Sequence, residues 1–308
     1  MSFNIDNCRW VCYGAKTKYD TFGHIFAAFE RALKYLGKDV RWLDESDIGN
    51  EPFDNTCFLT MNTVCKGIPK RLDCFYVVHN ASELSGFFDG LKIMGWGVHI
   101  STNSYEKRVE QIGPDIYFDK ESRVIQFRWA TDLLPHEIEN NKPYFAINRD
   151  SRVINYVGTI DPSNRQQFAK FGYAALENGI EMRQYGGYSG QPAVSIEDNV
   201  RLIKGSYMAP VIQRQSQVDT GYIPCRIFKN ISYGHFGVTH SKYVNDLFKN
   251  KLIYNEDPYK LFYQAKERLL AMPPEPKELY DLMDLVAKDF TYLNLVNGVT
   301  EAVRRLTC

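Results

Sequence analysis

The chain lacks the features that define several large classes of protein. Its 37 lysines and arginines are balanced by 37 aspartates and glutamates, whereas proteins that bind nucleic acids usually have a basic excess. No stretch approaches the roughly 18 apolar residues of a membrane-spanning helix, and the first residues lack the basic and apolar regions of a secretory signal. We therefore expect a cytoplasmic protein with no nucleic-acid partner and no transmembrane segment, and we leave peripheral contact with a membrane open.

Paired cysteines and the common nucleotide-binding motifs are also missing. The seven cysteines include no C-x-x-C pair, which argues against a zinc site or a redox dithiol. The sequence contains no G-x-x-x-x-G-K-[ST] phosphate loop, no G-x-G-x-x-G after its first predicted strand and no G-x-S-x-G. These absences weigh against P-loop enzymes, dehydrogenases and α/β-hydrolases.

What the first half does contain is an alternation of apolar runs and amphipathic stretches. A run over residues 9–13 predicts a buried strand, apolar residues at helical spacing predict a helix over 22–36, and a second strand follows at 40–43. A strand–helix–strand unit of this kind has parallel strands. Further strands are predicted at 56–60, 74–78, 97–100, 115–118 and 124–127. The first half is therefore typical of an open α/β sheet.

A polar segment that ends at Pro143 separates this pattern from a second α/β pattern. The predicted elements are strands at 153–157, 206–209 and 236–239, an apolar run at 200–203, and helices at 164–178, 225–233, 241–248, 258–271 and 275–306. We predict a first Rossmann-like domain over 1–142, a second over 143–276 and a helical tail over 277–308. The tail has an apolar stripe that includes Leu279, Leu282 and Val286, so we expect it to pack on the first domain.

The most informative segment is the loop 221–224 and the helix that follows it. Arg226 and Lys229 lie at i, i+3 in the first turns of this predicted helix. Two cations on one face oppose the helix dipole, but together with the exposed N–H groups they bind anions such as a diphosphate. The pattern thus predicts an anion site, and an ordinary exposed helix face is the alternative.

Several segments, in this order along the chain, resemble the C-terminal domain of glycosyltransferases of the GT-B fold, families 1 and 4. They are residues 157–160, 207–210, 226–230 and 234–239, and residues 129–135 resemble the end of the N-terminal domain of that fold. The resemblance implies two Rossmann-like domains that face each other across a cleft, with a C-terminal helix that crosses back to the first domain. It also implies an enzyme of glycan biosynthesis that transfers a hexosyl or deoxyhexosyl group from a UDP- or GDP-linked donor to a glycan or another hydroxyl acceptor.

The donor contacts that this resemblance implies are Gly158, Thr159, Tyr207, Tyr222, Arg226, Lys229 and Asn230. The chain departs from the pattern of many retaining members, because Gly221 and Lys229 occupy the two acidic positions of E-x7-E. The stereochemical outcome therefore stays open. The sequence also lacks a D-x-D pair in a strand-end loop, so we expect transfer without a metal, and the nucleotide-sugar is a substrate and not a cofactor.

An inverting transfer needs a general base, and His79 follows a predicted strand at a suitable place. Candidates for the acceptor side are Tyr13, Asp20, His24 and Asp132. His235 and His240 flank the strand predicted at 236–239, on the side of the donor. The alternative function is a two-domain α/β protein that binds a nucleotide or a sugar without turnover.

Overall fold

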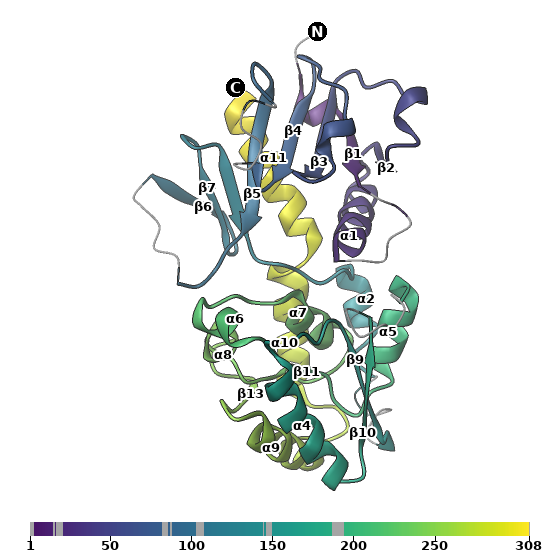
Figure 1. Ribbon diagram of the computed structural model, residues 1–308, viewed down its shortest axis with the longest axis vertical. Helices are drawn as coiled ribbons and strands as arrows, with labels where there is room; N and C mark the ends of the chain where they lie inside the picture. The colour runs from purple at the N-terminus through teal and green to yellow at the C-terminus, as the bar shows by residue number, and fades with distance from the viewer. Residues whose placement is uncertain are drawn as a thin grey trace. The chain divides into compact units, whose positions relative to one another are not determined.

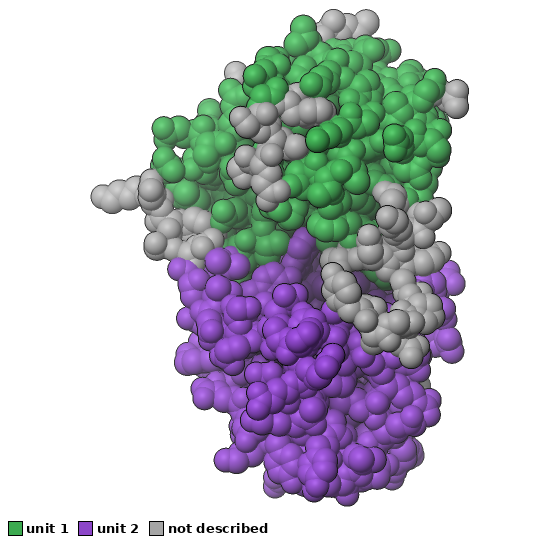
Figure 2. Space-filling model, viewed as in Figure 1, with its two compact units in different colours: residues 1–99, 103–128, 292–308 green, residues 100–102, 129–291 purple. Residues whose placement is uncertain are grey.

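The computed structural model of the chain divides into two compact units (Figure 2). It describes residues 3–14, 16, 21–81, 86, 88–102, 108–143, 145, 150–186 and 194–307. Unit 1 comprises residues 1–99, 103–128 and 292–308, and unit 2 comprises residues 100–102 and 129–291. The main change of unit therefore comes at residue 129, before the polar segment at which the sequence suggests a boundary.

Unit 1 is built on a sheet whose described strands number eight, in the order β2-β1-β3-β4-β5-β8-β7-β6 (Figure 1). The strands are β1 (Arg9–Tyr13), β2 (Val40–Leu43), β3 (Thr56–Met61), β4 (Phe75–His79), β5 (Lys92–Val98), β6 (Val109–Gly113), β7 (Ile116–Asp119) and β8 (Val124–Phe127). Neighbours from β2 to β8 are parallel, and β7 and β6 extend the sheet in antiparallel pairing. This mostly parallel sheet is the α/β class that the sequence predicts.

Two long helices of unit 1 come from opposite ends of the chain and pack together. They are α1 (Thr21–Tyr35) and α11 (Tyr292–Thr307). Phe29 of α1 meets Tyr292 of α11 edge to face, with ring centroids 4.8 Å apart. Gly298 of α11 lies so close to Ile116 that an added Cβ would be 2.9 Å from that side chain. The short 3-10 helices are η1 (Ile5–Asn7), η2 (Ile48–Asn50) and η3 (Cys65–Gly67).

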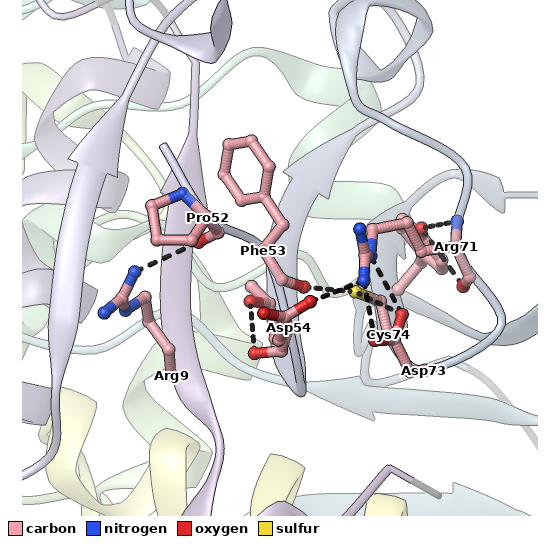
Figure 3. Close-up of polar contacts among 9 residues, drawn as sticks. Arg9, Pro52, Phe53, Asp54, Arg71, Asp73 and Cys74 are labelled. Atoms are coloured by element: carbon pink, nitrogen blue, oxygen red, sulfur yellow. Dashed lines mark hydrogen bonds and ion pairs between the residues drawn. The ribbon is translucent and has the colours of Figure 1, made fainter. Parts of the chain in front are cut away.

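The amino edge of the unit 1 sheet is fastened by polar contacts between the loops that enter β3 and β4 (Figure 3). The Arg71 guanidinium donates to Asp54 at 2.6 Å and to Asp73 at 2.8 and 2.9 Å. The Cys74 thiol donates to the carbonyl oxygen of Phe53 at 2.9 Å. These contacts hold the two loops together, so the polar side chains at this edge have a structural role.

Unit 2 contains two small parallel sheets that lie edge to edge. The first pairs β9 (Val153–Val157) with β10 (Glu181–Tyr185), and the second has the order β11 (Pro210–Val211), β12 (Val238–Thr239), β13 (Ile253–Tyr254). Tyr207 N donates to Val153 O at 2.8 Å, and the Tyr156 hydroxyl donates to Ile212 O at 3.0 Å. The segment 207–212 therefore runs alongside β9 in the same direction, and the strands of both sheets end at one common edge.

Helices surround these strands, and their apolar faces form the core of unit 2. They are α2 (Pro135–Glu139), α4 (Arg165–Glu177), α5 (Ile196–Lys204), α6 (Gln215–Asp219), α7 (Cys225–Ser232), α8 (Lys242–Leu247), α9 (Pro258–Ala271) and α10 (Lys277–Asp289). Within the described ranges, none of the helices combines the length and the apolar composition that crossing a bilayer requires.

The structure divides the predicted helical tail between the two units. Leu279, Leu282 and Val286 of α10 belong to the core of unit 2, and α11 belongs to unit 1. The prediction that the whole tail packs on the first domain is therefore wrong for the first half of the tail, α10. The helices separate at Phe290, whose ring stacks on Phe228 with centroids 4.7 Å apart.

Candidate ligand-binding site

The carboxyl edge of the unit 2 strands brings together residues from three separate parts of the chain. Gly158 follows β9, Gln213 lies two positions after β11, and His240 and Ser241 follow β12. In open α/β sheets, ligands bind outside the carboxyl ends of the strands. This edge is therefore the candidate site of unit 2.

Arg226 reaches this edge from the first turn of α7. Its guanidinium donates to the Tyr156 hydroxyl at 2.6 Å and to Val157 O at 3.0 Å, and it lies over the Tyr156 ring at 4.2 Å from the centroid. Gly158 makes room for it, because an added Cβ would lie 1.9 Å from Nη2 and the backbone φ of 149° is one that other residues rarely adopt. The guanidinium is thus held at a fixed place beside the end of β9.

Arg226 has hydrogen-bonding capacity left for a ligand. A guanidinium has five N–H donors, and the two contacts with Tyr156 and Val157 use two of them. The N-cap residue of α7 is Pro224, which provides no side-chain cap for the first-turn amide groups. A helix start without a cap and with a fixed cation beside it is suited to an anion.

Tyr222 borders the same edge and is held from several sides. The Trp129 indole donates to its hydroxyl at 2.6 Å, and Gln213 Nε2 donates to its carbonyl oxygen at 2.9 Å. Burial raises the pKa of the Tyr222 hydroxyl, so it stays protonated near neutral pH. Gly221 before it has a φ of 67°, and Ser101 N donates to its carbonyl oxygen at 3.0 Å.

Three buried polar atoms at this edge have no hydrogen-bond partner among the described residues: Gln213 Oε1, His240 Nε2 and Ser241 Oγ. Their side chains are at most 5% exposed. Burial lowers the pKa of His240, so its imidazole is neutral at physiological pH. Because buried polar atoms are nearly always hydrogen-bonded, these three atoms indicate a place for a bound polar group.

The loop after β9 adds charge at this edge. Arg214 approaches Asp161 at 3.4 Å, and Asp161 also accepts from Ser163. The side chain of Asn164 donates to Thr159 O at 3.3 Å, which fixes the backbone of Thr159 beside Gly158. The backbone of Thr159 is thus fixed just past the end of β9.

Lys229 has a different role from the predicted contact with phosphate. It forms a buried ion pair with Asp132, with Nζ 3.0 Å from Oδ2, and the Tyr233 hydroxyl donates to Asp132 Oδ1 at 2.7 Å. The two charges neutralise each other inside unit 2. This position does not fit the predicted donor contact of Lys229 or the predicted acceptor-side role of Asp132. Asn230 is also buried, and its amide donates to Ala209 O at 2.8 Å.

Tyr207 and His235 lie at the opposite, amino edge of the same strands. Tyr207 bonds to the first residue of β9, whereas Gly158 follows the last. Five residues of strand span roughly 15 Å, so Tyr207 and Arg226 do not meet at one diphosphate. Tyr207 and His235 instead line a cavity of about 30 Å³, and His235 Nε2 is 2.7 Å from Ile203 O.

The candidates of unit 1 lie near the carboxyl edge of its own sheet. His79 is the last residue of β4, and its ring packs against Trp96 and Phe22 at centroid distances of 4.4 and 5.6 Å. Tyr13 ends β1 but is only 2% exposed, so it belongs to the core. His24 is partly buried in the first turn of α1, and Asp20 lies outside the described residues.

Sequence reasoning missed Gln213 and Ser241 as site residues. The segment 206–209 is predicted as a strand, but β11 begins at Pro210, and this shift hides that Gln213 follows a strand end. Only the position of polar residues just past a strand could have revealed it. His240, in contrast, is expected from the sequence on the donor side, directly after a strand, and it follows β12 at this edge.

Among the residues that the structure describes, no three histidine, cysteine or acidic side chains are grouped in a way that could hold a metal ion. The candidate site combines the fixed guanidinium of Arg226, a helix start, neutral polar side chains and the ion pair of Arg214 with Asp161. The chain matches no protein-family model and no curated protein.

Proposed function

We propose that the protein is a glycosyltransferase whose unit 2 binds the nucleotide-sugar donor at the carboxyl edge of its strands. The observation that supports this most is the Arg226 guanidinium, fixed over Gly158 at the start of α7. Beside it lie buried polar atoms with no partner among the described residues. Such a site offers charge for a diphosphate and neutral hydrogen bonds for the rest of the donor.

In this proposal, Arg226 and the first-turn amide groups of α7 bind the two phosphates. The acceptor hydroxyl attacks the anomeric carbon, and the bond from that carbon to the phosphate oxygen breaks. The nucleoside diphosphate leaves with both electrons of the bond, and the cation and helix start stabilise the charge that develops on it. The hydroxyl proton passes to a general base, for which His79 is the candidate if the anomeric centre inverts.

The proposal includes the two-domain arrangement of the GT-B fold, with the acceptor on unit 1. Its support is the parallel sheet of unit 1, with His79 at the end of β4, and the parallel strands of unit 2, with Arg226 at their carboxyl edge. Each unit thus has polar residues where parallel strands end. That is the edge at which α/β proteins bind ligands.

The second candidate is a protein that binds a nucleotide or a sugar without turnover. Gln213, His240 and Ser241 favour it as much as they favour an enzyme, because neutral polar atoms bind without taking part in chemistry. Release of UDP or GDP from a panel of nucleotide-sugars with glycan acceptors separates the two. Nucleotide binding without any release would leave the binding function.

Replacing Arg226 with alanine is expected to weaken the binding of UDP or GDP by about 1.5–3 kcal/mol, because charge-assisted hydrogen bonds to phosphate are lost. Isothermal titration calorimetry measures the change. Arg201→Ala is the matched control, since Arg201 lies on α5 in an exposed pair with Asp198. Equal nucleotide affinity in Arg226→Ala and Arg201→Ala would remove Arg226 from the donor site.

Transfer is expected to continue in EDTA, because Arg226 and the start of α7 neutralise the diphosphate without an ion. Initial rates in EDTA, in added magnesium and in added manganese provide the measurement. Loss of activity in EDTA and its recovery with either metal would contradict the prediction. Binding of pyrophosphate in EDTA serves as a control that the anion site itself is intact.

A further inference from the structure

The orientation of Gln213 is fixed by its amide nitrogen. Nε2 donates to Tyr222 O at 2.9 Å, and the other end of the same amide group, Oε1, is buried without a partner among the described residues. Because the two ends of a side-chain amide differ in hydrogen-bonding role, this arrangement leaves an acceptor. Gln213 Oε1 is therefore available to accept a hydrogen bond from a bound group.

His240 also offers an acceptor. Its ring lies against two backbone acceptors, Val211 O at 3.4 Å from Nδ1 and the backbone of Gln213, and the tautomer that donates to Val211 O carries the proton of the neutral ring on Nδ1. Nε2 then has a lone pair, and it too is buried with no partner among the described residues. Gln213 and His240 thus present the same hydrogen-bonding character.

The two acceptors come from neighbouring strands. β11 and β12 are paired, with Val211 opposite Thr239, and adjacent strands are about 4.8 Å apart. Gln213 lies two residues after Val211, and His240 comes directly after Thr239 with its ring against Val211 O. Ser241 adds a buried hydroxyl that either donates or accepts.

We propose that Gln213 and His240 accept hydrogen bonds from two adjacent donor groups on the nucleoside part of the ligand. The vicinal hydroxyls of ribose and the N–H groups of the guanine edge both have this chemistry. The proposal rests on the function proposed above, because it takes the ligand to be a nucleoside diphosphate whose phosphates lie at Arg226. Lone pairs repel an anion, so Gln213 and His240 do not serve as a second phosphate site.

The experiment compares the affinities of inorganic pyrophosphate, UDP, GDP and the 2′,3′-dideoxy forms of UDP and GDP, by calorimetry. The wild-type protein is expected to bind UDP or GDP at least tenfold more tightly than pyrophosphate. Gln213→Met and His240→Phe, which keep the volume and remove the acceptor, are each expected to reduce nucleotide affinity roughly tenfold. Both variants are expected to keep the wild-type affinity for pyrophosphate.

His235→Phe is the matched control. It removes a buried imidazole from the same unit, but His235 lies at the amino edge of the strands and bonds to Ile203 O. Its ratio of nucleotide to pyrophosphate affinity is expected to stay as in the wild type. A fall of this ratio in His235→Phe equal to that in His240→Phe would overturn the proposal, because the effect would then be general destabilisation of unit 2.

The nucleotide panel distinguishes the source of the donors. If ribose supplies the donors, the wild type binds the dideoxy nucleotides tenfold more weakly than UDP and GDP. The two variants then show no such difference. If GDP binds tenfold more tightly than UDP and the variants remove the difference, guanine supplies the donors. Pyrophosphate binding with no gain from either nucleoside overturns the inference and leaves the anion site. Absence of binding by pyrophosphate and all nucleotides overturns the proposed function as well.

Discussion

Replacing Asp132 with alanine is expected to lower the free energy of unfolding by about 3–5 kcal/mol, the usual cost of leaving one partner of a buried ion pair alone. Asp132 and Lys229 are 8% and 9% exposed. Burial acts to raise the pKa of Asp132, but Lys229 and the Tyr233 hydroxyl hold it below its usual range. The same pairing raises the pKa of Lys229 despite its burial. Without the carboxylate, an ammonium group stays buried with no counter-charge. Urea denaturation measures the change.

Two further variants test whether the charge is the cause. Asp284→Ala removes the exposed partner of Lys142, whose Nζ is 2.9 Å from Asp284, and is expected to cost at most about 1 kcal/mol. The double variant Asp132→Leu with Lys229→Met removes both buried charges and is expected to recover most of the lost stability. A loss in Asp132→Ala no larger than that in Asp284→Ala would mean that the pair is solvated in solution.

Replacing His79 with alanine is expected to lower kcat at least about a hundredfold if the transfer inverts, because a general base contributes roughly 10²–10⁴-fold in rate. His79 lies at the carboxyl end of β4. The affinity for UDP or GDP is expected to stay near the wild-type value, since the proposed donor site lies in unit 2. Steady-state kinetics and calorimetry on the same preparations give both quantities.

The ring of His79 also packs on Trp96 and Phe22, so the alanine variant loses packing as well as a base. His79→Phe keeps an aromatic ring there and removes the nitrogen atoms. It is expected to retain the melting temperature of the wild type and to show the same loss of kcat. Near-normal kcat in His79→Phe would leave His79 a structural residue at a strand end, as would a product that retains the anomeric configuration.

Local sequence patterns predict the elements of this chain well where the pattern is regular. The helix expected at 22–36 is α1 at Thr21–Tyr35, and the helix expected at 258–271 is α9 with the same bounds. Strand β5 begins at Lys92, before the run expected at 97–100. The prediction misses the first part of the strand because Gly95 and Gly97 interrupt the apolar pattern. A glycine weakens a strand signal in the sequence, but paired neighbours on both sides hold β5 in the sheet.

The role of Lys229 could not be predicted from its neighbours. Its spacing from Arg226 favours one charged face of a helix, and the helix is present as α7. Which cation stays available depends on Asp132, which lies 97 positions earlier and pairs with Lys229 only in the folded chain. The same holds for Arg226, whose position depends on the ring of Tyr156 and on the space beside Gly158.

The separation of α10 from α11 also depends on tertiary contacts. The sequence has no glycine or proline near Phe290, so it predicts one helix over 275–306. In the structure Thr131 N donates to Phe290 O at 2.9 Å, and Thr131 pairs with Thr291. This pairing uses the backbone groups that a continuous helix would need.

The assignment of α11 to unit 1 has a consequence for synthesis of the protein on the ribosome. Residues 292–307 are translated after nearly all other residues of both units. When residues 1–128 have emerged, the sheet of unit 1 still lacks the helix that packs against α1 and covers Ile116. Unit 2 is almost continuous in sequence and is complete by residue 291. Domains tend to fold as units in the order of synthesis, but here the unit that is begun first is completed after unit 2, because its sheet lacks α11 until residues 292–307 have been synthesised.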